Sequence, residues 1–175
     1  MTPIRPPRSA IRLRPATPDD VPFFRHLYGT TREDEMRLVP WTDAEKAAFL
    51  DQQFLAQKTH YERSYTDCHF LTIELNGERI GRLYVDRGVP DEIEIVDIAL
   101  LPEHRGRGIG RMLLEEILAE GRATGRSVNI YVEHFNPARG LYDRLGFRHV
   151  DTNGVYHLLE WRAEVEPGET STSQN

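Results

Sequence analysis

Hydrophobic and polar residues alternate, or recur at helical spacing, over most of the chain, and this pattern predicts an ordered series of strands and helices. The first part predicts one strand and two helices, in the segments AIRLR, TPDDVPFFRHLYGTTR and TDAEKAAFLDQQFLAQ. Thr17 precedes Pro18 and is placed to cap the first helix. Thr42 and Glu45 have the spacing of a capping box, which predicts a sharp start for the second helix.

Two Asn-Gly pairs each lie between alternating runs and predict two hairpins. Asn76-Gly77 divides CHFLTIELNGERIGRLYVDRG, and Asn153-Gly154 divides FRHVDTNGVYHLLEW. Asparagine and glycine tolerate the positive φ angles that a tight hairpin turn requires. The sequence therefore predicts a strand pair in the middle of the chain and another at its end.

The alternation slips by one residue in the next run, DEIEIVDIALLP. Ile93 and Ile95 set one phase, whereas Val96, Ile98 and Leu100 set the other. A slip moves the following side chains to the opposite face unless an extra residue is inserted, as in a β-bulge. We therefore predict a bulge near Ile95 and Val96, with a strand buried on both faces as the alternative.

A helix, a strand and a short helix are predicted after this run. Apolar residues recur at helical spacing at Ile109, Leu113, Leu114, Ile117 and Leu118. Gly125 is a plausible helix end. The segment SVNIYVEHF places Val128, Ile130 and Val132 on one face of a strand. In NPARGLYDRLG, Asn136 before Pro137 predicts the N-terminal cap of a helix that ends at Gly146.

The composition indicates one domain. The chain has 175 residues, of which 39% are hydrophobic, so we expect a single domain with one core over residues 10–163, with flexible ends at 1–9 and 164–175. No run is long and apolar enough for a membrane helix and no signal peptide is evident, so we expect a cytoplasmic protein without a membrane partner. The net charge of -6 disfavours a nucleic-acid partner.

Arginine and glycine are concentrated immediately before the third predicted helix, in HRGRGIGR. A helix start exposes unpaired N–H groups and the positive end of the helix dipole, and both attract anions. Glycines at 106, 108 and 110 allow close approach, and arginines at 105, 107 and 111 add cationic donors. The junction predicts a diphosphate cradle. A P-loop is excluded because no Lys-Ser/Thr pair follows, and a dinucleotide fingerprint because the spacing is G-x-G-x-G.

The stretches EIVDIALLPEHRGRGIGRMLL and NPARGLYDRLGF resemble the GCN5-related N-acetyltransferase (GNAT) superfamily. Residues 105–110 match its Q/R-x-x-G-x-G/A signature. The resemblance implies an α/β (α+β) fold: a mixed, mostly antiparallel twisted sheet of six or seven strands, splayed at a bulged fourth strand and flanked by about four helices. It implies acetyl-CoA as the acyl donor. The seven histidines are scattered without the spacing of metal ligands, so no metal is expected. The implied cofactor-binding residues are Ile98, Ala99, Leu100, Arg105, Gly106, Arg107, Gly108, Ile109, Gly110, Arg111 and Asn136.

The resemblance also implies catalytic roles. Tyr142 matches the position of a tyrosine general acid that protonates the departing thiolate, and Glu94 matches a glutamate base in one branch of the family. Glu92, Asp97, Glu133 or a water chain are alternatives for the base. The only cysteine, Cys68, could form an acetyl-enzyme only beside an activating base. Its neighbour His69 would point to the other face of a strand, so direct transfer is favoured.

The acceptor is the least determined part. The resemblance implies that the segments EDEMRLVPW and 86–97 form its site. Both are acidic, which favours a cationic amine. We expect transfer of an acetyl group to a primary amine of a small molecule or peptide. The alternative is a non-enzymatic acyl-CoA sensor, and RNA binding through the arginine loop is disfavoured by the net charge. A homodimer through the terminal strands is left open.

Overall fold

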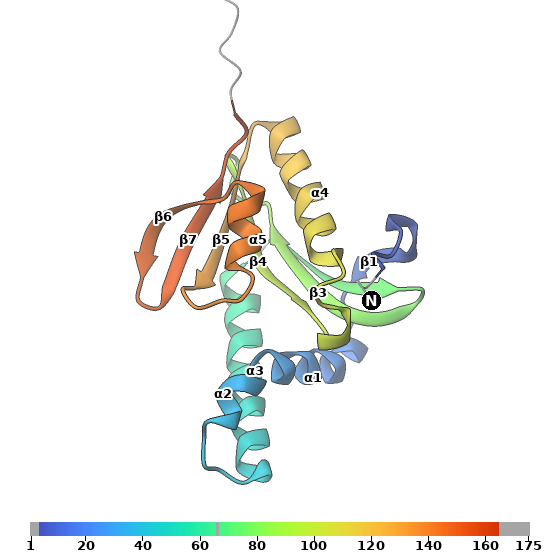
Figure 1. The fold of residues 1–175 in the computed structure, drawn as a ribbon, viewed down its shortest axis with the longest axis vertical. Helices are drawn as coiled ribbons and strands as arrows, with labels where there is room; N and C mark the ends of the chain where they lie inside the picture. The colour runs from blue at the N-terminus through green and yellow to red at the C-terminus, as the bar shows by residue number, and fades with distance from the viewer. Residues whose placement is uncertain (1–3, 66, 165–175) are drawn as a thin grey trace, which may run out of the picture.

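A seven-stranded sheet forms the centre of the molecule (Figure 1). The computed structural model describes residues 4–65 and 67–164. In spatial order the strands are β1 (Ile11–Pro15), β2 (Cys68–Leu75), β3 (Glu78–Asp86), β4 (Glu92–Leu100), β5 (Ser127–Glu133), β7 (Tyr156–Trp161) and β6 (Arg148–Asn153). Neighbours are antiparallel except for β4 and β5, which are parallel. The predicted mixed, mostly antiparallel sheet is confirmed.

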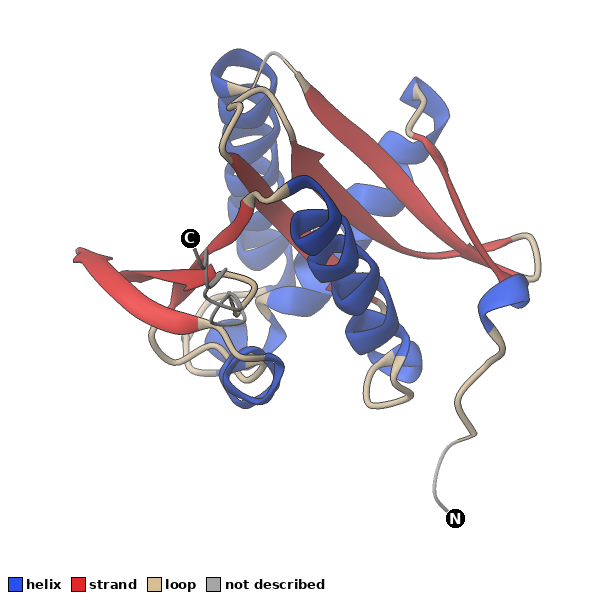
Figure 2. Ribbon diagram, turned by 90° about the horizontal axis from the view of Figure 1, so that it is seen from above, coloured by secondary structure: helices blue, strands red, loops and turns tan. Residues whose placement is uncertain are grey.

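Helices cover both faces of this sheet. They are α1 (Val21–Thr31), α2 (Glu33–Arg37), α3 (Asp43–Ser64), α4 (Ile109–Thr124) and α5 (Arg139–Leu145), with 3-10 turns at Arg8–Ala10, Pro18–Asp20 and Pro102–His104. Figure 2 shows α4 crossing one face of the sheet while α1 and α3 lie behind it. The sequence pattern did not predict α2, a helix of five residues between α1 and α3.

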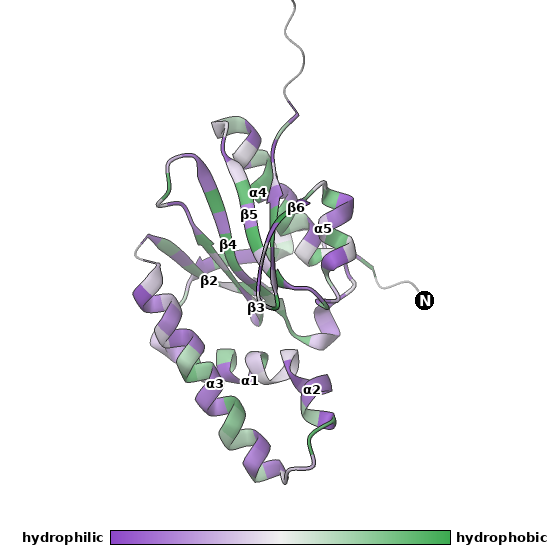
Figure 3. Cartoon of the chain, turned by 90° about the vertical axis from the view of Figure 1, so that its left-hand side faces the viewer, coloured by the Kyte–Doolittle hydropathy of each residue, from purple (hydrophilic) through white to green (hydrophobic). Residues whose placement is uncertain are grey.

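Two clusters of buried side chains hold these layers together. The larger joins the sheet to α4 and α5, and it contains all five apolar residues that recur at helical spacing in α4. The smaller contains Phe24, Leu27, Tyr28 and Phe54, where α1 and α3 pack on the opposite face. α2 and the start of α3 project beyond the sheet (Figures 1 and 3), which leaves Leu38 87% exposed.

Local signals in the sequence correspond closely to observed ends and turns. Thr42 and Glu45 form the predicted capping box at the start of α3, with the Thr42 N–H donating to Glu45 Oε2 at 2.8 Å. Asn76 and Gly77 have φ angles of 51° and 86°, as the tight turn between β2 and β3 requires. The second hairpin turns one residue later than predicted. Its turn is formed by residues 154 and 155, because Asn153 is still paired with Tyr156.

The sequence predicts flexible ends at residues 1–9 and 164–175. Residues 1–3 and 165–175 lie outside the described residues. Residues 4–10 lie beside α4: Pro6 is buried, and Arg8 donates to Glu116. The domain boundaries at residues 10 and 163 stay a prediction.

Candidate active site

The parallel strands β4 and β5 separate halfway along their length and form a wedge. They pair from Glu92 opposite Ser127 to Ile95 opposite Ile130, and in the described residues their pairing ends there. β4 continues beside β3, and β5 continues beside β7. Figure 1 shows the two strands diverging towards their C-terminal ends. The β4 backbone beyond Ile95 therefore has no strand partner on the β5 side.

A bulge lies where the wedge opens. Ile95 is opposite Val85 and Asp97 is opposite Tyr84, so Val96 is the extra residue. Ile95 packs in the larger core, and beyond the bulge Ile98 also packs against that core. The slip in alternation thus has the predicted physical cause, because the inserted residue changes which positions face α4.

The loop that follows β4 presents a row of backbone donors at the start of α4. Among the described residues, none of the N–H groups of residues 106–111 donates a hydrogen bond, and the first helical donor is Met112 N, 3.0 Å from Gly108 O. Gly106 and Gly108 have φ angles of 68° and 77°, which favour glycine. A methyl group added at Gly106 or Gly110 would meet no atom within 4 Å. The cradle is therefore open and rich in donors.

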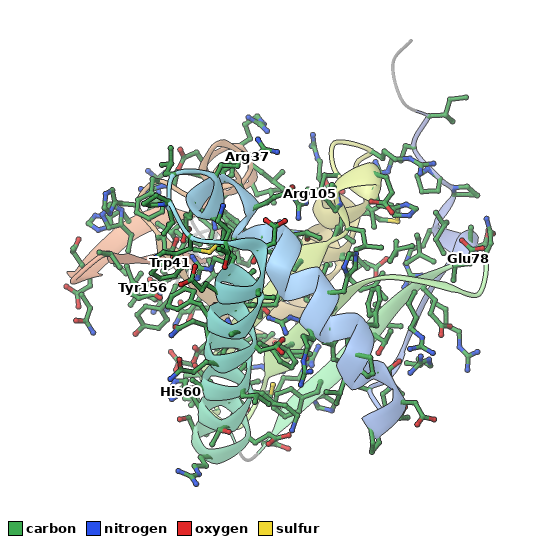
Figure 4. The ribbon with its side chains drawn as sticks, turned by 90° about the horizontal axis from the view of Figure 1, so that it is seen from below. Arg37, Trp41, His60, Glu78, Arg105 and Tyr156 are labelled. Atoms are coloured by element: carbon green, nitrogen blue, oxygen red, sulfur yellow. The ribbon has the colours of Figure 1, made fainter. Side chains whose placement is uncertain are left out.

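The three arginines of the loop have local partners. Arg105 Nε donates to Leu100 O at 2.8 Å and its Nη2 to Thr30 Oγ1 at 3.1 Å, so Arg105 connects the end of β4 to α1 (Figure 4). Arg107 Nη1 lies 3.3 Å from His104 Nδ1. Arg111 Nε donates to Glu115 at 2.7 Å. Binding of phosphate by these side chains stays a prediction, whereas the backbone donors are available without rearrangement.

Tyr142 lies on α5 beside the larger core. It is 3% exposed, and its ring packs edge-on against Phe147 with a centroid distance of 5.6 Å. Burial, aided by the negative charge of Asp97, raises the pKa of Tyr142 well above that of a free tyrosine. The phenol therefore stays protonated at neutral pH, which is the state that a general acid needs.

Glu94 lies on the opposite face of β4 from Ile93 and Ile95, next to the end of α3. Tyr65, the residue after α3, donates its hydroxyl to Glu94 Oε1 at 2.6 Å. Burial raises the pKa of Glu94, and the hydrogen bond from Tyr65 opposes this effect. A half-buried carboxylate with a raised pKa is a better proton acceptor than a solvated one.

The sequence pattern of the Acetyltransferase (GNAT) family matches residues 24–147. The chain belongs to the GNAT family. A relative from Haemophilus influenzae, ribosomal protein bS18-alanine N-acetyltransferase, is 28% identical over 135 residues, which cover 77% of this chain and 81% of the relative. Mycothiol acetyltransferase of Corynebacterium glutamicum is 36% identical over 103 residues, which cover 58% of this chain and 34% of that protein.

Solved structures confirm the GNAT fold. The PaiA N-acetyltransferase from Thermoplasma acidophilum in complex with coenzyme A superimposes with a TM-score of 0.65 at 18% identity, covering 87% of this chain and 99% of the other. The ribosomal-protein-S18-alanine N-acetyltransferase from Escherichia coli gives a TM-score of 0.58 at 20% identity, covering 91% and 97%. With the family match, these results identify the protein as a GNAT acetyltransferase.

The alternative bases of this GNAT enzyme each face a cation or an amide: Glu92 with Asn129, Asp97 with Arg82, and Glu133 with Arg32. Asp97 Oδ2 lies 2.5 Å from Arg82 Nη2 but out of hydrogen-bond geometry, so it has no hydrogen-bond partner in the described part of the chain. Glu94, by contrast, accepts its hydrogen bond from the uncharged hydroxyl of Tyr65. It remains the preferred candidate.

The surroundings of Cys68 and Asn136 show what each side chain does in the structure. Burial, together with the charges of Asp86 and Glu94, raises the pKa of Cys68 to about 12, so the thiol is not activated at neutral pH. Asn136 Oδ1 accepts from Ala138 N at 2.8 Å, and α5 begins only at Arg139. The predicted cap therefore closes the turn before α5 rather than the helix itself. Contact of Asn136 with the cofactor stays a prediction.

The predicted acceptor segment EDEMRLVPW carries less uncompensated negative charge than its composition suggests. Its acidic residues form local ion pairs, which partly neutralise them: Glu33 and Asp34 with Arg37, and Glu35 with Arg32. Asp86, Glu92 and Glu94 lie on or near the paired half of β4. In Figure 4, Trp41 and Tyr156 lie on the same side of α3, and each is more than 40% exposed, at 43% and 44%.

Three contributors to the site were missed by the sequence analysis. Tyr65 carries no local signal, because its contact with Glu94 spans 29 residues. Arg82 is 4% exposed on β3, and its place in an alternating run could have marked it as inward-facing. Thr30 was included in a predicted helix but not linked to the loop. The described residues contain no group of histidine, cysteine or carboxylate side chains placed to hold a metal, and no helix among them could cross a membrane.

Proposed function

We propose that this GNAT enzyme transfers the acetyl group of acetyl-CoA directly to a primary amine. The observation that carries the proposal is the continuity of the site. The unpaired edge of β4 leads to the unused N–H groups of residues 106–111, and Tyr142 and Glu94 lie on elements that border the wedge.

The chain offers groups that fit acetyl-CoA. The N–H groups at the start of α4 would bind the diphosphate, where the open space at Gly106 and Gly110 admits it. Leu101 N donates to Ile80 O on β3, so in this antiparallel register Ala99 also faces β3, while Ile98 faces the wedge. The free backbone of Ile98 would bind the pantetheine arm as an added strand does. Leu100 O already accepts from Arg105, so its carbonyl has a partner before the cofactor binds. The cofactor supplies the activated thioester.

Two side chains have the proton roles. As the amine nitrogen bonds to the carbonyl carbon and the carbon–sulfur bond breaks, Glu94 accepts the proton released by the amine, directly or through water. Tyr142 donates a proton to the departing sulfur. N–H groups along the wedge stabilise the charge that develops on the carbonyl oxygen. The protonation states fit these roles, because the phenol is protonated at neutral pH and the raised pKa makes the carboxylate more basic.

The acceptor is proposed to be a cationic amine in solution that loses its proton in the site. The H. influenzae relative is named for an alanine of a ribosomal protein and the C. glutamicum relative for mycothiol, so peptide and small-molecule acceptors are both represented among the relatives. The carboxylates near the paired half of β4 would attract either kind of ammonium group.

Thermal unfolding with acetyl-CoA, CoA, ATP, NAD or no ligand tests the cofactor. A ligand at 100 times its dissociation constant adds about 2.7 kcal/mol of stability, which raises the melting temperature by several degrees. We expect a rise with the two coenzyme A species alone. No rise with either one would refute the proposal.

Release of free thiol then tests the reaction, with small amines and with peptides whose first residue is alanine as acceptors. We expect release of CoA that depends on one of these amines. Coenzyme binding without acetylation of any acceptor would support the acyl-CoA sensor instead.

A further inference from the structure

The N-terminal arm, residues 4–10, is fixed against the first half of α4. Arg8 binds the carboxylate of Glu116 through Nε and Nη2, and its Nη1 donates to Ile11 O at 2.6 Å. Pro6 is buried beside α4. Two prolines in succession restrict the backbone of the arm, so holding it in place loses little entropy.

This anchoring places Arg5 against the glycine at the cradle. A methyl group added at Gly108 would lie 3.2 Å from Arg5 Cδ and 3.5 Å from Arg5 Nε. Gly108 is the N-cap of α4 and belongs to the stretch whose N–H groups are unused. The guanidinium of Arg5 therefore extends from a distant part of the sequence to the edge of the predicted diphosphate cradle.

Arg5 also forms weaker contacts within the protein than Arg105 and Arg111 of the loop do. Arg105 binds the end of β4 and Arg111 donates to Glu115 at 2.7 Å, whereas Arg5 Nη2 lies 3.9 Å from Glu115. The side chain of Arg5 is 51% exposed. A cavity of about 540 Å³ opens between the arm and α4, with Arg5 in its wall. The guanidinium of Arg5 therefore has open space beside it on the side of Met112 and Glu115.

We propose that Arg5 is a cofactor-binding residue that pairs with a phosphate of coenzyme A, so that the N-terminal arm completes the nucleotide side of the site. This inference rests on the proposed use of acetyl-CoA. The chemistry is that of a charge-assisted pair: a planar guanidinium with several donors beside a row of backbone N–H groups, all directed at an anion. Coenzyme A has phosphate in its diphosphate and on its ribose, and both present the same acceptor oxygens.

The test is isothermal titration of CoA and of dephospho-CoA, which lacks the ribose phosphate, into the full chain and three variants. Arg5→Gln removes the charge, and Arg5→Lys keeps it. Arg148→Gln is the matched control, because Arg148 is an exposed arginine on the edge strand β6. We expect Arg5→Gln to weaken CoA binding by about tenfold, as for loss of one charge-assisted hydrogen bond. Arg5→Lys should recover most of the affinity, and Arg148→Gln should bind as the wild type does.

The outcomes separate this inference from the proposed function. If the loss in Arg5→Gln persists with dephospho-CoA, the diphosphate is the partner; if it disappears, the ribose phosphate is. Either result supports the inference. The inference would be overturned if Arg5→Gln bound CoA and dephospho-CoA with the same affinities as the wild type. That result would leave the use of acetyl-CoA intact. A wild-type protein that binds neither ligand would refute both.

Discussion

Replacing Tyr142 by phenylalanine removes one hydroxyl from the centre of the candidate site. The residue is 3% exposed, and its ring contact with Phe147 does not involve the hydroxyl. No hydrogen bond contributes to its pKa shift, which arises from burial and from Asp97. Because no internal partner is lost, we expect the free energy of unfolding to change by less than about 1 kcal/mol.

The effect on catalysis should be much larger. Loss of a general acid lowers turnover by about a hundredfold to ten-thousandfold, which corresponds to roughly 3 to 5 kcal/mol in the activation barrier. Affinity for acetyl-CoA should stay near the wild-type value, since the phenol acts on the sulfur as it leaves. Because its pKa is raised, Tyr142 should also cause no loss of wild-type rate between neutral pH and the ordinary pKa of tyrosine.

Single-turnover rates of CoA release are the appropriate assay, because slow product release could conceal a slower chemical step. Tyr28→Phe is the matched control, since Tyr28 is 6% exposed and belongs to the smaller cluster on the other face of the sheet. Thermal unfolding of both variants checks their stability. A Tyr142→Phe enzyme with the wild-type rate would show that Tyr142 only packs.

Three further predictions concern other groups. The pKa of Glu94 is raised, so a base at this position should give a rate that falls as the pH drops through it. Tyr65→Phe should move the midpoint of that fall in kcat/KM to higher pH, because it removes a hydrogen bond that lowers this pKa; an unchanged midpoint would exclude Glu94 as the base. Asp20 is fully buried against Arg14, which holds its pKa far below the ordinary value. Its stabilisation is complete above the unfolded-state pKa of about 4 and is lost as the pH falls towards the folded-state pKa. Asp20→Asn should therefore lower the free energy of unfolding at pH 7 by roughly 3 kcal/mol and flatten the acid limb measured by urea unfolding. Gly121→Ala should destabilise the protein by about 1 to 3 kcal/mol, as thermal unfolding can show, since the added methyl would lie 2.9 Å from Val128 Cγ2.

Several features could be predicted because they depend on neighbours in the sequence. The capping box of Thr42 and Glu45 needs only a spacing of three residues, and Asn76-Gly77 needs only tolerance of positive φ. The bulge at Val96 followed from the change of phase along a single strand. The open cradle followed from glycine spacing before an amphipathic helix.

Contacts between distant segments could not be predicted in this way. The hydrogen bond from Tyr65 to Glu94 depends on where α3 ends above β4, and the position of Arg5 beside Gly108 depends on how the arm packs on α4. The short helix α2 was missed because its charged residues show no apolar period. These positions depend on packing between elements, which a local pattern does not contain.

The sequence by itself determined the order and type of most elements, the bulge and the loop at the start of α4, because local sterics, backbone hydrogen bonding and the period of apolar residues govern them. Only the tertiary structure decided which loop arginines are already engaged, which carboxylate meets a hydroxyl rather than a cation, and which residue reaches the cradle from the N-terminal arm. These choices depend on the relative placement of β4, α3, α4 and the arm, which is set by burial of apolar surface across the whole core.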